Sequence, residues 1–307
     1  MCTIETAYIN FLKMNKIPLK IIVFIIPVFL FSCKNPRTQN NGSNKQVITV
    51  SILPQKTFIE KIAGDDFYVN ILLPPGASPA SFTLLPSQLK DISMSKIWMR
   101  IGYIGFEFSW KDKIEQANSD MKVLDLSEEL ELISTENISQ GDNKSAAGIN
   151  PHIWLSPKMV KQMSRRITDE LSLLKPERKD VYETNYEKFC QEIDILDAEI
   201  INMLEKYQGR IVIIFHPILT YYARDYGLVQ ESLEPAGKEP TPQRMTELIN
   251  LAKTENIRVI YIQSEIDREQ ALVFSEEVNG KIIEINPLSP DWAENLKEIT
   301  RVITENF

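Results

Sequence analysis

The chain contains only two histidines, His152 and His216, and both stand where a strand-like segment gives way to a loop or a helix. His216 directly follows the apolar run 211–215, and His152 lies in the segment 150–157. Ligands of open α/β sheets bind beyond the carboxyl ends of the strands, so both side chains could face one site. Imidazole is the commonest metal-binding side chain and suits zinc. The pair therefore predicts a metal site, and on spacing alone the alternative is two unrelated structural histidines.

Strand-like and helix-like segments alternate along the part of the chain that must position these histidines. Strands are expected at 47–53, 67–73, 97–101, 122–126, 211–215, 228–232, 259–262 and 282–285. Helices are expected at 56–63, 86–93, 219–226, 242–255, 268–277 and 291–304. This alternation predicts an α/β fold with two lobes, each with its own core and a parallel sheet flanked by helices.

One long helical pattern separates the two halves. From Pro176 to Tyr207 the sequence has no glycine and no second proline, and apolar residues recur at helical spacing. Pro176 fits the first turn of a helix, and Gly209 follows its end. We therefore expect an N-terminal lobe at 47–175, a linking helix at 176–208 and a C-terminal lobe at 209–307.

The first residues predict export and a lipid anchor. Lys16 and Lys20 precede an apolar stretch at 21–31, which is too short to span a bilayer, since that needs about 20 apolar residues. Leu-Phe-Ser-Cys at 30–33 looks like a lipobox, so residues 1–32 are expected to be a lipoprotein signal peptide and Cys33 the lipidated residue. The alternative is a plain membrane anchor with an incidental cysteine. Translation could begin at Met1 or at Met14.

The composition predicts a flexible tether and argues against one class of partner. Residues 33–46 are polar apart from the ends and are expected to be a flexible tether. Cys190 lies within the long helical pattern, where we expect it to be buried or half-buried. The formal net charge of −8 argues against nucleic acid as a partner and suits attraction of cations, although solubility alone would also explain it.

The segments around the histidines resemble the metal-binding solute-binding proteins of ABC importers, over nearly the whole chain after the signal. N-P-H-I-W-L-S-P at 150–157 resembles the family's D-P-H-x-W-L-S-P segment. His216 with the Y-Y-A-R-D-Y-G-L run at 221–228 resembles another ligand segment, and I-N-P-L at 285–288 resembles L-D-P-L. K-E-P-T-P at 238–242 resembles an E-P-S loop. The long helix resembles the rigid connection between the family's lobes.

The resemblance implies a ligand set from which this chain departs. Ala80 occupies the position of a first-lobe ligand histidine and has no donor atom, and Asn286 replaces an aspartate with a neutral amide. Gln263 stands where a glutamate is often found. The expected metal ligands are then His152, His216, Asn286 and Glu239, where Glu239 is equally well read as a solvated loop glutamate.

The resemblance implies capture of a divalent transition metal on the periplasmic side and its delivery to an ABC importer permease. Zn²⁺ is the expected cargo, with Mn²⁺ or Fe²⁺ as alternatives. The protein is expected to be monomeric and held to a membrane through Cys33. One alternative is a lipoprotein of the same fold that has lost tight metal binding and acts in adhesion or assembly. A metallohydrolase would need an open metal position and a general base, for which the sequence offers no H-E-x-x-H motif.

Overall fold

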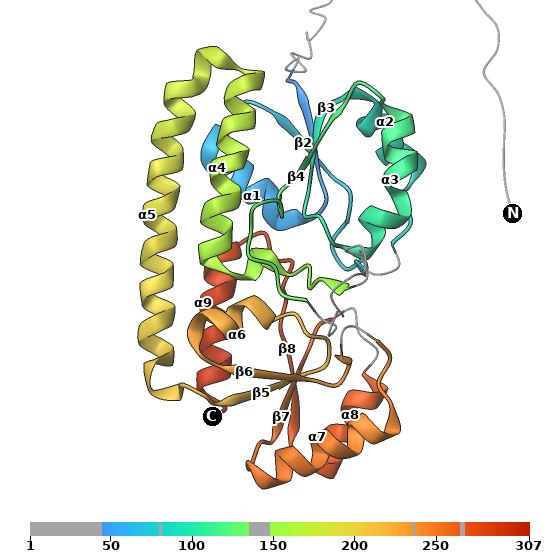
Figure 1. The fold of residues 1–307 in the computed structure, drawn as a ribbon, viewed down its shortest axis with the longest axis vertical. Helices are drawn as coiled ribbons and strands as arrows, with labels where there is room; N and C mark the ends of the chain where they lie inside the picture. The colour runs from blue at the N-terminus through green and yellow to red at the C-terminus, as the bar shows by residue number, and fades with distance from the viewer. Residues whose placement is uncertain (1–44, 80–81, 135–147, 236–237, 265–267) are drawn as a thin grey trace, which may run out of the picture. The chain divides into compact units, whose positions relative to one another are not determined.

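The computed structural model describes residues 45–79, 82–134, 148–235, 238–264 and 268–307, and Lys45–Phe307 form one compact unit. Two parallel four-stranded sheets lie within it (Figure 1). The first sheet, in the order β2-β1-β3-β4, contains Tyr68–Ile71, Val47–Val50, Ser95–Arg100 and Lys122–Asp125. The second, in the order β6-β5-β7-β8, contains Val229–Ser232, Ile211–Ile214, Val259–Ile262 and Lys281–Glu284. The predicted α/β class is confirmed, and both sheets have the same strand order.

Helices follow the strands in each half, as the crossovers of a parallel sheet require. In the first half they are α1 (Leu53–Ala63), α2 (Pro86–Met94), α3 (Gly105–Ala117) and α4 (Pro157–Leu174). In the second half they are α6 (Thr220–Tyr226), α7 (Pro242–Thr254), α8 (Glu269–Glu277) and α9 (Trp292–Thr304). Every strand and helix expected from the sequence is present, with ends shifted by a turn or less. Helices α3 and α4 were not among the expected elements.

The long helix α5 (Lys179–Leu204) is confirmed and is extended by 3-10 turns at Pro176–Arg178 and Glu205–Tyr207. Its 26 residues span about 39 Å at 1.5 Å per residue. It packs against α1 and α4 of the first half and against α9 and α6 of the second (Figure 1). Cys190 on this helix is half-buried, as expected. The helix therefore supports both sheets from one side.

The apolar core is largely continuous between the halves. One cluster of buried residues includes Ile48 and Val50 of the first sheet, Phe189 of α5, and Ile214 and Tyr261 of the second sheet. A smaller cluster, with Ile213 and Phe274, is confined to the second half. The expectation of a separate core in each lobe is thus wrong for the larger cluster. The reason is that α5 and α9 bury apolar faces against both halves at once.

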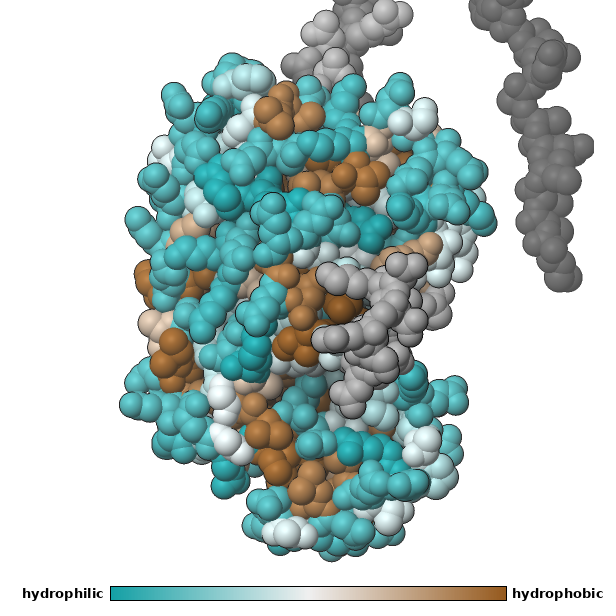
Figure 2. Space-filling view, viewed as in Figure 1, coloured by the Kyte–Doolittle hydropathy of each residue, from teal (hydrophilic) through white to brown (hydrophobic). Residues whose placement is uncertain are grey.

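The visible surface consists mainly of hydrophilic residues (Figure 2). Smaller hydrophobic areas lie between the hydrophilic residues on the face seen in Figure 2. In the described ranges, no helix combines the length and the apolar character needed to cross a bilayer.

Proline in the middle of α5 should test how much the molecule depends on that helix. Ile195 is 60% exposed, so its side chain contributes little burial. Ile195→Pro removes a helical hydrogen bond and clashes with the preceding turn, so the free energy of unfolding should fall by about 3 kcal/mol or more. Urea unfolding followed by circular dichroism measures the change. Ile195→Ala is the matched control and should stay within about 0.5 kcal/mol of the unsubstituted protein. Equal midpoints for the proline and alanine variants would contradict this dependence.

Candidate metal centre

The second sheet places a row of polar residues just beyond the carboxyl ends of its strands. The amide of Phe215 donates to Tyr261 O (2.8 Å), and the amide of Glu234 donates to Phe215 O (2.9 Å). This continued pairing brings His216, which follows β5, level with Glu234, which follows β6. Because all the strands are parallel, their carboxyl ends meet at one edge, which is where α/β folds bind ligands.

His152 reaches the same region from the segment that connects the first sheet to α4. A 3-10 turn at Ile153–Leu155 follows it. Trp154 Nε1 donates to Pro287 O (2.8 Å), and Trp292 Nε1 donates to Trp154 O (2.7 Å). Both contacts reach residues of the second half, so they fix the histidine segment against the second sheet.

The two imidazoles meet, as the sequence predicts. The ring centroids of His152 and His216 lie 5.3 Å apart, with the ring planes at 78°. Zinc binds imidazole nitrogen at about 2.0–2.1 Å, so two rings that share one ion must lie about this close. His152 is 7% exposed, whereas the His216 side chain is 26% exposed. Burial, and secondly the neighbouring His216, hold the pKa of His152 well below its usual value, so the ring is neutral and able to bind a metal.

Asn150 fixes the orientation of His152. Its Nδ2 donates to Pro217 O (2.8 Å) and to Thr220 Oγ1 (2.9 Å), so its Oδ1 must point the other way. That oxygen accepts from the backbone amide of His152 (3.0 Å) and lies 2.9 Å from His152 Nδ1. A carboxamide oxygen only accepts, so Nδ1 carries the proton and Nε2 keeps its lone pair for a metal.

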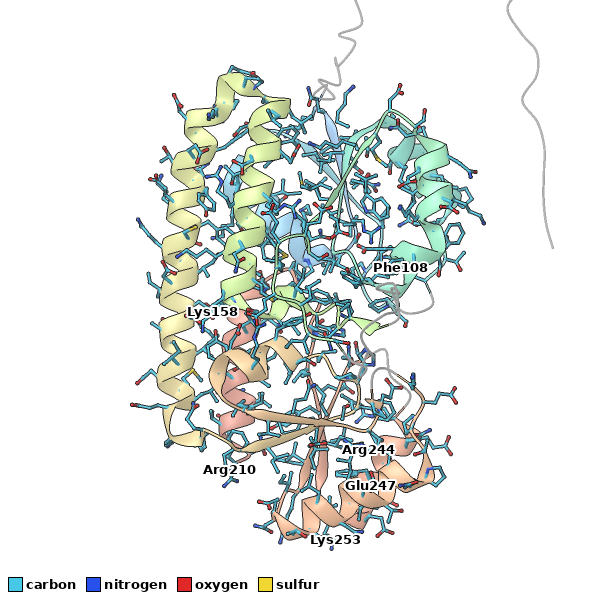
Figure 3. The ribbon with its side chains drawn as sticks, in the orientation of Figure 1. Phe108, Lys158, Arg210, Arg244, Glu247 and Lys253 are labelled. Atoms are coloured by element: carbon cyan, nitrogen blue, oxygen red, sulfur yellow. The ribbon has the colours of Figure 1, made fainter. Side chains whose placement is uncertain are left out.

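Glu234 fixes the orientation of His216. Glu234 was not among the site residues predicted from the sequence. Its Oε2 lies 2.7 Å from His216 Nδ1, so the carboxylate accepts the Nδ1 proton and leaves Nε2 free. Arg244 of α7 (labelled in Figure 3) holds the preceding strand by donating to Ser232 O and Glu231 Oε2. The available signal was the pair Glu234-Pro235, which begins two residues after the predicted strand 228–232. The family resemblance pointed instead to the next Glu-Pro pair, Glu239-Pro240.

The other two expected ligands, Glu239 and Asn286, are exposed, whereas His152 is buried and His216 half-buried. The Oδ1 of Asn286 accepts from the amide of Leu288 (3.0 Å), and its backbone oxygen accepts from Asn295 Nδ2 (2.7 Å). Ala80 and Cys33 lie outside the described residues. Within the described ranges, no group of three or more histidine, cysteine, aspartate or glutamate residues is arranged to hold a metal ion. The candidate site is therefore the histidine pair, with Asn150 and Glu234 bonded to the Nδ1 atoms of His152 and His216.

Known proteins share both the sequence pattern and the fold. The family model described as zinc-uptake complex component A, periplasmic, matches residues 48–306. The high-affinity zinc uptake system protein ZnuA of Bacillus subtilis is 24% identical over 272 residues, which is 84% of each chain. The manganese-binding lipoprotein MntA of Halalkalibacterium halodurans is 21% identical over 262 residues, which is 83% of each chain.

A solved structure has the same fold as this chain. A crystal structure of ZnuA superposes with a TM-score of 0.78 at 33% identity and covers 86% of this chain and 99% of that one. The chain therefore belongs to the zinc-uptake component A family, the periplasmic metal-binding components of ABC importers.

Proposed function

We propose that this protein captures one divalent transition-metal ion, zinc, between His152 and His216 and delivers it to an ABC importer permease. The observation that carries the proposal is the facing pair of imidazoles, in which both Nδ1 atoms are engaged and both Nε2 atoms are left to bind an ion. Histidines with unrelated structural roles would not need to lie this close together with both Nδ1 atoms held by acceptor groups.

The donor types favour zinc over harder ions. Two neutral imidazoles suit zinc, whereas Mn²⁺ prefers carboxylate, carbonyl and water oxygens. A tetrahedral zinc site needs four donors, of which water can supply one. Asn286 and Glu239, both exposed in this structure, are the further ligands that the family resemblance offers. Mn²⁺ and Fe²⁺ remain alternative cargoes, and their binding would show as competition with zinc.

The second candidate function is that of a lipoprotein with this fold that has lost tight metal binding and acts in adhesion or assembly. Ala80 at a family ligand position favours it, because alanine supplies no donor atom. The buried Asn150 and the Glu234–His216 pair favour metal capture, because a chain that no longer binds metal has no need to hold both imidazoles in one tautomer.

We infer that the protein works at the periplasmic face of a membrane as a lipid-anchored monomer. Lipidation of Cys33 and a polar tether at 33–46 would keep the folded unit close to its permease. No enzymatic step is needed for capture and delivery.

Removing one histidine should nearly abolish zinc binding. The chelator-treated protein should bind about one zinc ion per chain in isothermal titration, and elemental analysis should find the same ratio. His216→Ala leaves one strong donor, so the affinity should fall by more than the roughly 10–100-fold that is typical when a hydrogen-bond partner of a ligand is removed. If His216→Ala binds zinc as tightly as the unsubstituted protein, the site lies elsewhere.

Two glutamate variants and one asparagine variant locate the remaining donors. Glu234→Gln keeps the shape but replaces the anionic partner of His216, so zinc affinity should fall by about 10–100-fold. Glu239→Gln should weaken binding only if that carboxylate moves onto the ion, and a silent result would remove Glu239 from the site. Asn286→Asp should tighten binding, because an anionic oxygen would replace a neutral one beside a dication.

The buried His152 should make the metal-free protein less stable as the pH falls. Because its pKa is lowered in the folded state, the unfolded chain binds a proton below about pH 6.5 that the folded chain does not. Stability should therefore be unaffected by this group above that pH and should decline below it, by up to about 1.4 kcal/mol per pH unit. Urea unfolding of the unsubstituted protein and of His152→Gln, each without metal, isolates this contribution as a difference. Parallel stability curves for the two proteins would show that His152 is not held neutral.

Substitution of Cys33 tests the anchor. The Cys33→Ala protein should lack lipid, because the thiol is the attachment atom. Metabolic labelling with a fatty-acid analogue measures the attachment. Cys190→Ala is the control and should still be labelled. Label that persists in Cys33→Ala would refute lipidation at this position.

A further inference from the structure

Gln263 has a buried polar atom with no partner in the described part of the chain. The residue is 7% exposed, and its Oε1 accepts no hydrogen bond there. The fully buried Gln55 provides the contrast. Its Oε1 accepts from the amides of Ser51 and Ile52, and its Nε2 donates to Met99 O. A buried carbonyl oxygen without a donor costs free energy, so native proteins seldom keep one without a reason.

The position of Gln263 suggests the reason. It is the first residue after β7, and His216 is the second residue after β5, with Ile214 of β5 paired to Tyr261 of β7. His216 lies two residues after Ile214, and Gln263 lies two residues after Tyr261. Continuing the register of the pair therefore places His216 beside Gln263. Side chains alternate along a strand, so both point to the same face of the sheet as Ile214 and Tyr261. The strand order reverses between β5 and β7, and such switch points are where open α/β sheets hold ligands.

We propose that Gln263 Oε1 is an oxygen donor to the metal cargo, binding the ion directly or through one water molecule. The inference rests on the proposed function and adds a residue to its site. A bound dication would supply the missing partner of the oxygen, so the atom that is unsatisfied without cargo becomes satisfied with it. A carboxamide donates a neutral oxygen, so the row Glu234, His216 and Gln263 carries one formal negative charge beside the ion.

The test compares Gln263→Leu with Gln55→Leu, two buried glutamines that differ in whether their hydrogen bonds are made. Zinc affinity is measured by isothermal titration and metal-free stability by urea unfolding, on the chelator-treated chain. Gln263→Leu should weaken zinc binding by about 10-fold or more and leave the urea midpoint unchanged or raised. Gln55→Leu should lower the midpoint and leave zinc affinity unchanged, because its partners are backbone groups of the first half.

A second substitution at Gln263 and a cobalt(II) spectrum test the same donor independently. Gln263→Glu should tighten zinc binding, since it places an anionic oxygen at the same atom. Cobalt(II) loaded in place of zinc should show a visible spectrum that changes in Gln263→Leu and not in Gln55→Leu, because the spectrum follows the donor set. Unchanged zinc affinity and an unchanged cobalt spectrum in Gln263→Leu would overturn this inference and leave the proposed function standing. Failure of the unsubstituted protein to bind zinc would overturn both.

Discussion

The candidate site depends on one buried contact, the bond from Asn150 Nδ2 to the carbonyl oxygen of Pro217. Asn150 belongs to the segment that carries His152, and Pro217 follows His216 directly. The contact fixes which end of the amide faces His152, and so which imidazole nitrogen is protonated. The same asparagine accepts from Tyr221 Oη through its backbone oxygen (2.7 Å) and donates its amide to Ile133 O (3.0 Å). With every polar group satisfied, a 1% exposed residue can hold two chain segments in one geometry.

The two histidines are supported by partners of different charge. His216 has a carboxylate behind it, and His152 has a carboxamide. An anionic hydrogen-bond partner makes an imidazole a better donor to a cation than a neutral amide does, so His216 should be the stronger ligand of the two. His152 contributes in another way, because its burial keeps it neutral and therefore ready to bind. The proposed site would thus combine one ligand with an anionic partner and one that burial keeps neutral.

The elements were predictable from the sequence where local pattern decides structure. Strand Val259–Ile262 was placed correctly to the residue because a buried parallel strand reads as a continuous apolar run. Helix α4 was not predicted, although Met159, Val160, Met163 and Ile167 form an apolar stripe after the N-cap Ser156. Glu234 and Asn150 could not be assigned their roles in advance. Their partners lie in other segments, 18 and 67 residues away, and only the pairing of β5 with β6 and the packing of the lobes bring them together.

The described groups of the site are all anchored on the second half of the molecule. His216, Glu234 and Gln263 follow its strands, and His152 is tied to it by the contacts of Asn150 to Pro217 and of Trp154 to Pro287. Ala80, the first-half position that carries a ligand in the family pattern, supplies no donor. In the proposed site, the affinity for the ion would therefore be set by residues of the second half, namely Glu234, His216 and Gln263.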